Sequence, residues 1–497
     1  MKRTLFSLAG LLLLLFAGHW AVKAASSNLS ASKTSAPPSD LHASTSAEAT
    51  PAAVHALERE GAGYVLEIRG IGSAVDKYGR TRVWELIQQK HDSHSSFLSR
   101  DPKDYDLAQD EQAATRRSGG AFRDTAINSV EYWPLPVILL GPEVDPHDED
   151  IAQWLTGLRQ QATLGVTLLL YQESARTTSA EAALERLFQF FDEHPDVPEA
   201  VVMSLDGETM RTIGRRNRSL HVPEYPDAMA GILVSRSDRV DRLIRPYVVK
   251  DVPGSINKFD TQYDTIKLWN FFWSKRLVYM GISEKQEEAR GVIGTSGFGT
   301  PKADWWIQQL PQLWQQTATG KDGFKPSPYI PVRWTDWQLE QFDQAPLLGY
   351  LHRPVKVMLH DAQGQPLKPA EQVAALKAGW QQAVASLPEG SKPERVFYDT
   401  SEHKNWVVPL TQALQDNAEA LSLDDVDTGY DIGYRVGKTG VSSALLQIGL
   451  ATVAGYDDGK ISATINLGAD GNVGILMVSP PDAEAKQRNV ENPFNVY

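Results

Sequence analysis

Short apolar runs alternate with helix-length segments along most of this chain, and this alternation constrains the fold more than any other feature of the sequence. In the first half, apolar runs at 136–140, 166–171 and 198–205 are separated by helical patterns at 148–162 and 180–193. A continuous apolar run is typical of a strand that is covered on both faces. Strands that alternate with helices pair in parallel through right-handed crossovers. The sequence therefore predicts an α/β protein with a mixed, mainly parallel sheet.

The second half of the chain repeats this scheme. A strand is expected at 354–359, a helix at 369–386 and another strand at 394–398. Any two units of this kind look broadly alike, so the pattern favours two related α/β halves without deciding whether they arose by duplication. Residues 93–131 are polar and are expected to form loops.

The first 24 residues have the pattern of an export signal. Lys2 and Arg3 precede an apolar run from Leu5 to Ala17, and Val22-Lys23-Ala24 has the small residues of a cleavage site. This pattern predicts a secretory signal peptide. Residues 4–22 are also just long enough for a retained membrane anchor, so both interpretations stay open. In either case we expect the folded body to be exported, periplasmic or tethered to the inner membrane.

Composition and missing motifs remove several classes of function. The chain has 497 residues, a net charge of −13 and no cysteine. A general nucleic-acid binder needs a basic surface, so no nucleic-acid partner is expected. The lack of cysteine excludes disulfides, Cys-ligated metals and cysteine nucleophiles. Gly437-Lys438-Thr439 lacks the upstream glycine of a phosphate-binding loop, because Ile432 stands there. We therefore expect no cofactor and no metal.

One group of ionisable residues could carry chemistry. Asp399, Ser401, Glu402 and His403 directly follow the strand expected at 394–398. In α/β sheets ligands gather outside the carboxyl ends of strands, and an acid beside a base there can transfer protons. The alternative is a polar turn that caps the next helix. The first interpretation would make the protein an envelope hydrolase that uses the Asp399/His403 region.

Tryptophan is concentrated between the two halves. Seven of the 13 tryptophans lie between Trp269 and Trp337. They could form a helical layer packed on the sheet, a protein-binding surface, or a sugar-stacking surface, since tryptophan is enriched at interfaces. Arginines at 211–218, followed by four more at 236, 239, 242 and 245, could be a solvated face or a dock for an acidic partner or a lipid headgroup. The candidate partner-binding residues are Trp305, Trp306, Trp314, Trp334, Trp337, Arg215 and Arg216.

The C-terminal part of the chain resembles the closing part of thiolase-like condensing enzymes. Residues 427–433 lead into 438–444, a small-residue helix follows, and the next strand ends in Asn466-Leu467. The loop histidine of those enzymes matches Lys438, and their catalytic cysteine has no counterpart here. The resemblance implies a thiolase-like fold of two related halves that has lost condensing activity. A periplasmic ligand-binding protein on this degenerate scaffold is a further alternative.

Longer strings between Tyr64 and Pro481 resemble the type VI secretion lipase-adapter family. They include residues 66–70, 75–79, 190–198, 325–335, 337–339 and 351–354. The resemblance implies a non-enzymatic adapter that binds a lipase effector and helps to load it on the secretion spike protein. Such loading is expected in the cytoplasm, whereas the N-terminal segment predicts export from it. The body would be cytoplasmic if that segment is not used.

These patterns divide the chain into five predicted segments. Residues 25–60 are rich in Ser, Ala, Thr and Pro and cannot bury enough apolar area to fold. The segments are a signal peptide or membrane anchor at 1–24, a disordered linker at 25–60, an N-terminal α/β half at 61–255, an aromatic-rich helical segment at 256–345 and a C-terminal α/β half at 346–497.

Overall fold

Twelve stretches of the chain are described by the structure, which is a computed structural model. They are residues 63–90, 95–105, 107–141, 148–172, 180–211, 221–250, 263–289, 299–415, 417, 421–468, 470–489 and 492–494. The expected signal or anchor at 1–24 and the linker at 25–60 lie outside these residues, as do Arg215 and Arg216. No helix within the described stretches combines the length and the apolar character of a membrane span.

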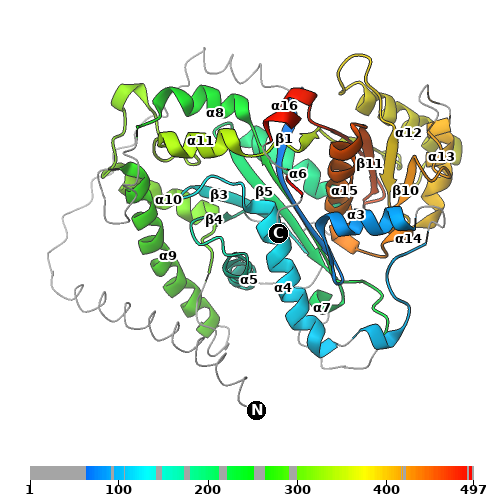
Figure 1. The fold of residues 1–497 in the computed structure, drawn as a ribbon, viewed down its shortest axis with the longest axis horizontal. Helices are drawn as coiled ribbons and strands as arrows, with labels where there is room; N and C mark the ends of the chain where they lie inside the picture. The colour runs from blue at the N-terminus through cyan, green and yellow to red at the C-terminus, as the bar shows by residue number, and fades with distance from the viewer. Residues whose placement is uncertain are drawn as a thin grey trace. The chain divides into compact units, whose positions relative to one another are not determined.

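A mixed twelve-stranded sheet runs through both halves of the chain (Figure 1). The N-terminal half contributes β1 (Leu66–Val75), β2 (Tyr78–Gly79), β3 (Pro134–Leu140), β4 (Leu168–Tyr171), β5 (Glu199–Asp206) and β6 (Ala228–Ser235). The C-terminal half contributes β7 (Gly349–Leu351), β8 (Val355–Val357), β9 (Arg395–Tyr398), β10 (Gly429–Asp431), β11 (Ser462–Leu467) and β12 (Val473–Ser479). The strand order is β10-β9-β11-β12-β7-β1-β6-β5-β3-β4, with β2 paired to β1 and β8 to β12.

The two halves have the same topology. With the short strands β2 and β8 set aside, each half has five strands, counted here in chain order. From the outer edge inward, both halves place them in the order third, second, fourth, fifth, first. In both halves the outer three strands are parallel, the fifth is antiparallel to the fourth, and the first is antiparallel to the fifth. The halves join where β1 pairs antiparallel with β7, with Leu66 opposite Leu351. This shared topology confirms two related α/β halves.

Parallel pairing is confined to the outer strands, so the expectation of a mainly parallel sheet is wrong. The central strands β6, β1, β7 and β12 all pair antiparallel with their neighbours. The reason is in the connections. A short turn joins β11 to β12, with Gly471 donating to the carbonyl of Gly468, and a turn of this length can connect only antiparallel strands.

Equivalent helices follow equivalent strands in the two halves. Pairs of helices connect the first strand to the second, the second to the third and the third to the fourth. They are α4 (Leu107–Ala126) with α12 (Pro369–Val384), α5 (Asp148–Gln161) with α13 (Val407–Gln415), and α6 (Ala180–Glu193) with α15 (Ser443–Asp458). One core cluster contains side chains of both halves, including Phe191 of α6 and Leu450 of α15. The helix expected at 180–193 is confirmed by α6.

Helix α4 corrects the expectation that residues 93–131 are loops. A Cβ atom added at Gly72 of β1 would lie 1.8 Å from the carbonyl oxygen of Ala121, and one added at Gly231 of β6 would lie 2.6 Å from Oγ1 of Thr125. The helix therefore rests with its backbone almost directly on the sheet, which only glycine permits. It was missed because it packs through small residues and not through an apolar stripe.

An aromatic layer covers the outer edge of the N-terminal half (Figure 1). It consists of α9 (Asp264–Ala289), α10 (Ala303–Trp314), α11 (Asp336–Gln344) and the residues between α10 and α11. Its side chains pack on Leu168 and Leu170 of β4. The remaining elements are α3 (Arg80–Gln89), α7 (Glu208–Arg211), α8 (Ser237–Leu243), α14 (Ile432–Arg435), α16 (Ala483–Arg488), and the 3₁₀ turns η2 (Pro102–Asp104), η3 (Arg245–Tyr247), η4 (Lys321–Gly323), η5 (Lys404–Trp406) and η6 (Gly440–Ser442).

Candidate functional site

A buried carboxylate closes the end of β5. Asp206, the last residue of β5, is fully buried. Its oxygens accept hydrogen bonds from Arg211 at 2.7 and 2.8 Å, from the N–H of Val441 at 2.9 Å and from the N–H of Gly207 at 2.7 Å. Each oxygen thus accepts two bonds, which uses the capacity of a carboxylate. Asp206 therefore ties the two halves together and is not poised for proton transfer.

Lys438, the match to the loop histidine of the thiolase-like enzymes, is held in ion pairs beside this carboxylate. Its Nζ lies 3.0 Å from Glu224, 3.2 Å from Glu402 and 4.3 Å from the ring centre of Tyr225. Burial alone would lower the pKa of Lys438, but hydrogen bonds to Tyr225, Glu224 and Glu402 outweigh it and raise the pKa above its usual value. Lys438 is a permanent cation at neutral pH and cannot act there as a base.

The structure does not bring Asp399 and His403 together. Asp399 accepts hydrogen bonds from the Oγ of Ser443 at 2.5 Å and from the N–H of Ser401 at 2.7 Å. His403 is exposed, and among the described residues no hydrogen bond joins it to Asp399. The arrangement matches the alternative of a polar turn, in which Asp399 fixes the loop against α15. No group of three His, Asp or Glu side chains in the described stretches is placed to hold a metal ion.

The tryptophans of the aromatic layer divide into buried and partly exposed sets. Trp306 and Trp334 are fully buried. Trp334 meets Trp133 edge to face, with ring centres 5.5 Å apart, and Trp306 meets Phe272 at 5.4 Å. Neither the Trp306 nor the Trp334 indole N–H has a hydrogen-bond partner among the described residues, so apolar packing stabilises this part of the layer.

The other candidate tryptophans are partly exposed. Trp305 packs on Tyr279 of α9, with ring centres 4.9 Å apart. Trp314 donates its indole N–H to the carbonyl of Pro331 at 3.1 Å. Trp337, on α11, is the only one of the three that belongs to a longer chain of ring contacts among the described residues. Of the five tryptophans expected at a partner surface, three can therefore reach a partner.

Four partly exposed aromatic rings form a continuous row along α9, here called the aromatic row. Tyr132 contacts Trp337 on one side and Trp269 on the other, with ring centres 5.9 and 5.0 Å apart. Trp269 in turn contacts Trp273 at 5.4 Å, one helical turn further along α9. All four rings are half-buried, which combines a fixed position with access to a partner.

Tyr132 is held in this row by an unusual backbone conformation. Its φ is +55°, a left-handed value that is uncommon for a bulky residue and that persists only where the surroundings enforce it. Its N–H donates to the carbonyl of Val166 at 3.0 Å. The preceding residue, Glu131, is tied to α11 at both ends of its peptide group, because its N–H donates to Gln341 at 2.9 Å and its carbonyl accepts from Gln338 at 2.8 Å.

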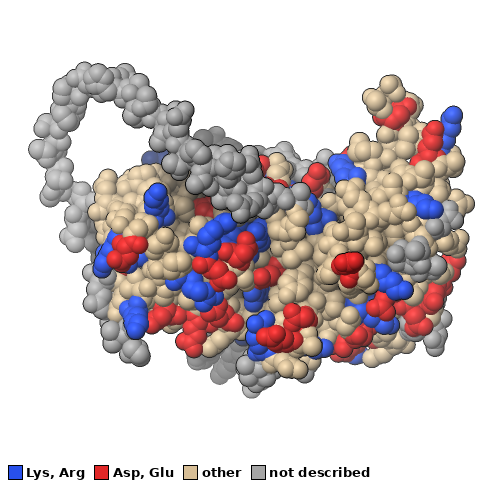
Figure 2. Space-filling view, turned by 90° about the horizontal axis from the view of Figure 1, so that it is seen from above, with Lys and Arg blue, Asp and Glu red and all other residues tan. Residues whose placement is uncertain are grey.

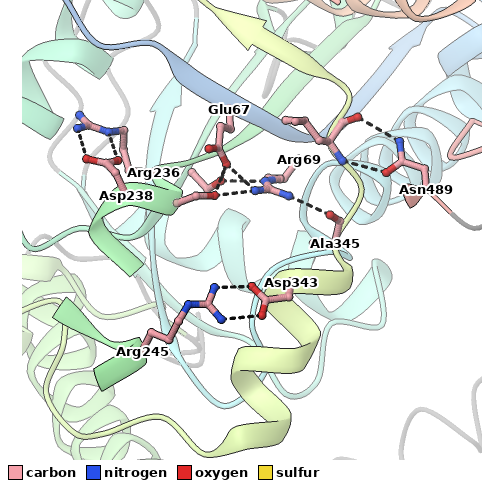
Figure 3. A network of polar contacts seen from close by, with 11 residues as sticks. Glu67, Arg69, Arg236, Asp238, Arg245, Asp343, Ala345 and Asn489 are labelled. Carbon is pink, nitrogen blue, oxygen red and sulfur yellow. Dashed lines mark hydrogen bonds and ion pairs between the residues drawn. The ribbon is translucent and has the colours of Figure 1, made fainter. Parts of the chain in front are cut away.

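The arginines that follow β6 do not form a solvated basic face. Arg236 and Arg239 are buried, and Arg239 donates to the carbonyls of Phe191, His194 and Val197 at the end of α6. Figure 3 shows how the others are paired: Arg236 with Asp238 at 2.7 Å and Arg245 with Asp343 at 2.8 Å. Arg69 forms the centre of the same network and pairs with Glu67 at 2.5 Å. These arginines join elements of the fold.

Charge on the surface is mixed. On the face shown in Figure 2, basic side chains are interspersed with acidic ones. The whole chain carries a net charge of −13. A surface of this kind does not attract a polyanion over a wide area.

Sequence reasoning missed three members of the candidate site. Tyr132 follows a stretch that was interpreted as loops, and no local pattern signals its contact with Trp269 and Trp337. Trp269 and Trp273 belong to the tryptophan cluster but were not among the candidate partner-binding residues. The spacing of Trp269 and Trp273, four residues apart on a helix, is the signal that could have identified a shared face.

Two family models match the chain. The model of the N-terminal part of the type VI lipase adapter protein Tla3 matches residues 64–224, and the model of its C-terminal part matches residues 348–480. Neither model matches the residues between 224 and 348, which include the aromatic layer.

Among solved structures, the chain is similar to several ketosynthases. One is the ketosynthase from module 6 of the bacillaene synthase of Bacillus subtilis 168. The two sequences are 7% identical, the match covers 85% of this chain and 71% of that chain, and the TM-score is 0.42. Another is an oxazolomycin ketosynthase domain from Streptomyces albus, at 10% identity, 85% and 97% coverage and a TM-score of 0.40. A third is the ishigamide ketosynthase/chain length factor, at 10% identity, 84% and 100% coverage and a TM-score of 0.39. These TM-scores lie below 0.5, too low to carry function from those proteins to this chain.

Proposed function

Because this chain belongs to the family of type VI lipase adapter proteins described as Tla3, we propose that it is a non-enzymatic adapter that binds a lipase effector and helps to load it for type VI secretion. The observation that carries the proposal is the match of both family models, one to each α/β half. Together they span the strands from β1 to β5 and from β7 to β12.

The polar groups at the carboxyl ends of the strands support a role without catalysis. Asp206 is saturated with hydrogen bonds, Lys438 is held in ion pairs, and Asp399 is used to fix a turn. A general base needs a free lone pair within reach of a substrate, and a nucleophile needs a base beside it. None of these three groups meets that condition.

We propose the aromatic row as the surface that contacts the lipase effector. Large aromatic side chains that are fixed in place but partly exposed supply most of the binding energy at many protein interfaces. The rings of Trp337, Tyr132, Trp269 and Trp273 have this property, and the three tryptophans lie in the segment that the family models leave unmatched. A surface of this kind suits recognition of one particular effector on a shared scaffold.

The test is calorimetric titration of the full chain with the purified lipase effector. Trp337→Ala is expected to weaken binding by about 30-fold, since truncating an interface anchor costs about 2 kcal/mol. Tyr434→Ala is the matched control, because Tyr434 is an exposed aromatic residue outside the aromatic row. Equal affinity of the wild type and Trp337→Ala would remove the aromatic row from the interface. Failure of the wild type to bind any lipase effector would remove the adapter function itself.

We also propose that the body of the protein is exported, on the strength of the charged and apolar pattern at residues 2–24. A reporter fused to the C-terminus and assayed in fractionated cells tests this. Activity in the cytoplasm alone would contradict export and would favour loading of the effector inside the cell. In that case residues 1–24 would not be used as a signal.

A further inference from the structure

Two arginines stack on the last ring of the aromatic row. The guanidinium carbons of Arg159 on α5 and Arg276 on α9 each lie 5.0 Å from the ring centre of Trp273. Both arginines line one small hollow beside the edge strand β4. Its other lining residues are Thr156, Leu169, Phe272, Trp273, Thr300 and Pro301.

The positive charges of this pair are not neutralised by the described part of the chain. Arg159 donates only to backbone carbonyls, those of Thr167 at 2.9 Å and of Gly165. Arg276 has a ring contact but neither a hydrogen bond nor an ion pair with a described residue. Two other arginines with little exposure have a carboxylate partner: Arg236 pairs with Asp238, and Arg395 pairs with Asp458.

Burial makes this arrangement unfavourable for the free protein. Burial lowers the pKa of Arg276 to about 10. Burial and the positive charge of Arg276 together lower the pKa of Arg159 to about 10. Both groups are still cations at neutral pH. Two like charges that are largely removed from water favour a site for an anion, because an anion would replace the lost solvation.

The shape of the hollow selects the kind of anion. Its volume is about 10 Å³, enough for one small polar group. Guanidinium groups offer planar forks of N–H donors that match carboxylate oxygens. The hydroxyls of Thr156 and Thr300 are hydrogen-bonded to each other at the wall, with their oxygens 3.0 Å apart. Next to the hollow, Leu277 follows Trp273 by one helical turn and is 52% exposed.

We propose that Arg159 and Arg276 bind a carboxylate side chain of the protein partner, while Leu277 and the aromatic row contact apolar residues that flank it. This inference rests on the proposed adapter function and names the chemistry that the adapter recognises: an acidic residue within an apolar segment of the lipase effector. The unpaired positive charge of the hollow is the complement of that acidic residue.

An anionic lipid surface fits the same site less well. The chain is acidic overall, and acidic and basic side chains are interspersed on the face shown in Figure 2, so this surface does not attract a negatively charged membrane over a wide area. Binding to anionic vesicles tests the membrane alternative.

The main experiment compares Arg276→Gln with the wild-type full chain in calorimetric titrations with the lipase effector at low and high salt. The variant is expected to bind at least about 10-fold more weakly at low salt and to lose most of the salt dependence. The unfolding temperature of Arg276→Gln should not fall, because Arg276 has no hydrogen bond with a described residue that the substitution would remove. Lys275→Gln is the matched control: it removes the same charge one residue away, where Lys275 bonds Gln312 and does not line the hollow.

Two further measurements separate this inference from the adapter function. Succinate is expected to raise the unfolding temperature of the wild type and not that of Arg276→Gln, whether or not any effector binds. An equal rise in both would contradict an anion site at Arg276. If the wild type and Arg276→Gln bind the effector equally tightly, the result supports the adapter function and contradicts the carboxylate site. Binding to phosphatidylglycerol vesicles that Arg276→Gln abolishes would assign the site to a membrane and overturn the proposal.

Discussion

The edge strands β4 and β10 occupy the same place in the two halves, yet the chain builds different surfaces over them. Over β4 lies the aromatic layer, with its row of partly exposed rings and a pair of arginines that have no counter-charge among the described residues. At β10 the polar groups pair internally, and Asp431 accepts from Thr400 and from the N–H of Tyr434. One architecture can therefore keep a self-contained edge in one half and carry the proposed docking surface on the other.

The family models follow the same division. They match both α/β halves and leave out most of the residues that make the β4 edge different. The added layer therefore carries the proposed choice of partner. Three sets of substitutions test this difference between the two halves.

The largest effect is expected from removing a core ring at either edge. Trp334→Ala should lower the free energy of unfolding by about 3–5 kcal/mol, because a fully buried tryptophan leaves a large cavity. Trp406→Ala, at the edge of the C-terminal half, should be similarly destabilising, since Trp406 is buried and donates to the carbonyl of Asp399. Urea denaturation measures both losses.

Effector binding should then separate the two variants. At a temperature where both are folded, only Trp334→Ala is expected to bind the lipase effector more weakly, because Trp334 packs beneath the aromatic layer. Equal losses of affinity in the two variants would mean that the edges do not differ in function.

A smaller effect is expected at the start of the fourth strand of each half, where the N-terminal half has Glu199 and the C-terminal half has Ser462. Burial raises the pKa of Glu199 to about 7, although its carboxylate accepts the N–H of Val130. The unfolded chain loses this proton near pH 4.5, so the native state binds more protons between pH 4.5 and 7 and stability falls as pH rises through that window.

Glu199→Gln should therefore raise the free energy of unfolding at pH 8 by at most about 3 kcal/mol and change it little at pH 4. Urea denaturation at the two pH values measures the difference. A stabilisation that is equal at both pH values would show that Glu199 does not titrate in this window. The unchanged residue Ser462 makes no such contribution in the other half.

The smallest effect is expected from His403→Ala at the edge of the C-terminal half. His403 is exposed and has no hydrogen bond with Asp399, so stability should change by no more than about 0.5 kcal/mol. Effector binding and secretion of the lipase should also stay unchanged. Loss of secretion with normal stability and normal binding would revive the hydrolase interpretation.

Much of the scaffold could be predicted from the sequence. The helix expected at 180–193 is α6, and the strands expected at 198–205 and 394–398 are β5 and β9 with small shifts at their ends. These elements have strong periodicity or long apolar runs, which are properties of a few neighbouring residues. Helix α4 and the aromatic row were not predictable in this way, because each depends on residues that are distant in the chain.

The sequence by itself determined the class of fold, the two halves and the family, because apolar periodicity and long motifs are written in consecutive residues. Tertiary contacts specify that the central strands are antiparallel, that Trp306 and Trp334 are core residues, and that Arg159 and Arg276 share Trp273 with no carboxylate partner among the described residues. The physical reason is that pairing, burial and charge neutralisation depend on which distant side chains meet. No local pattern in the sequence records those meetings.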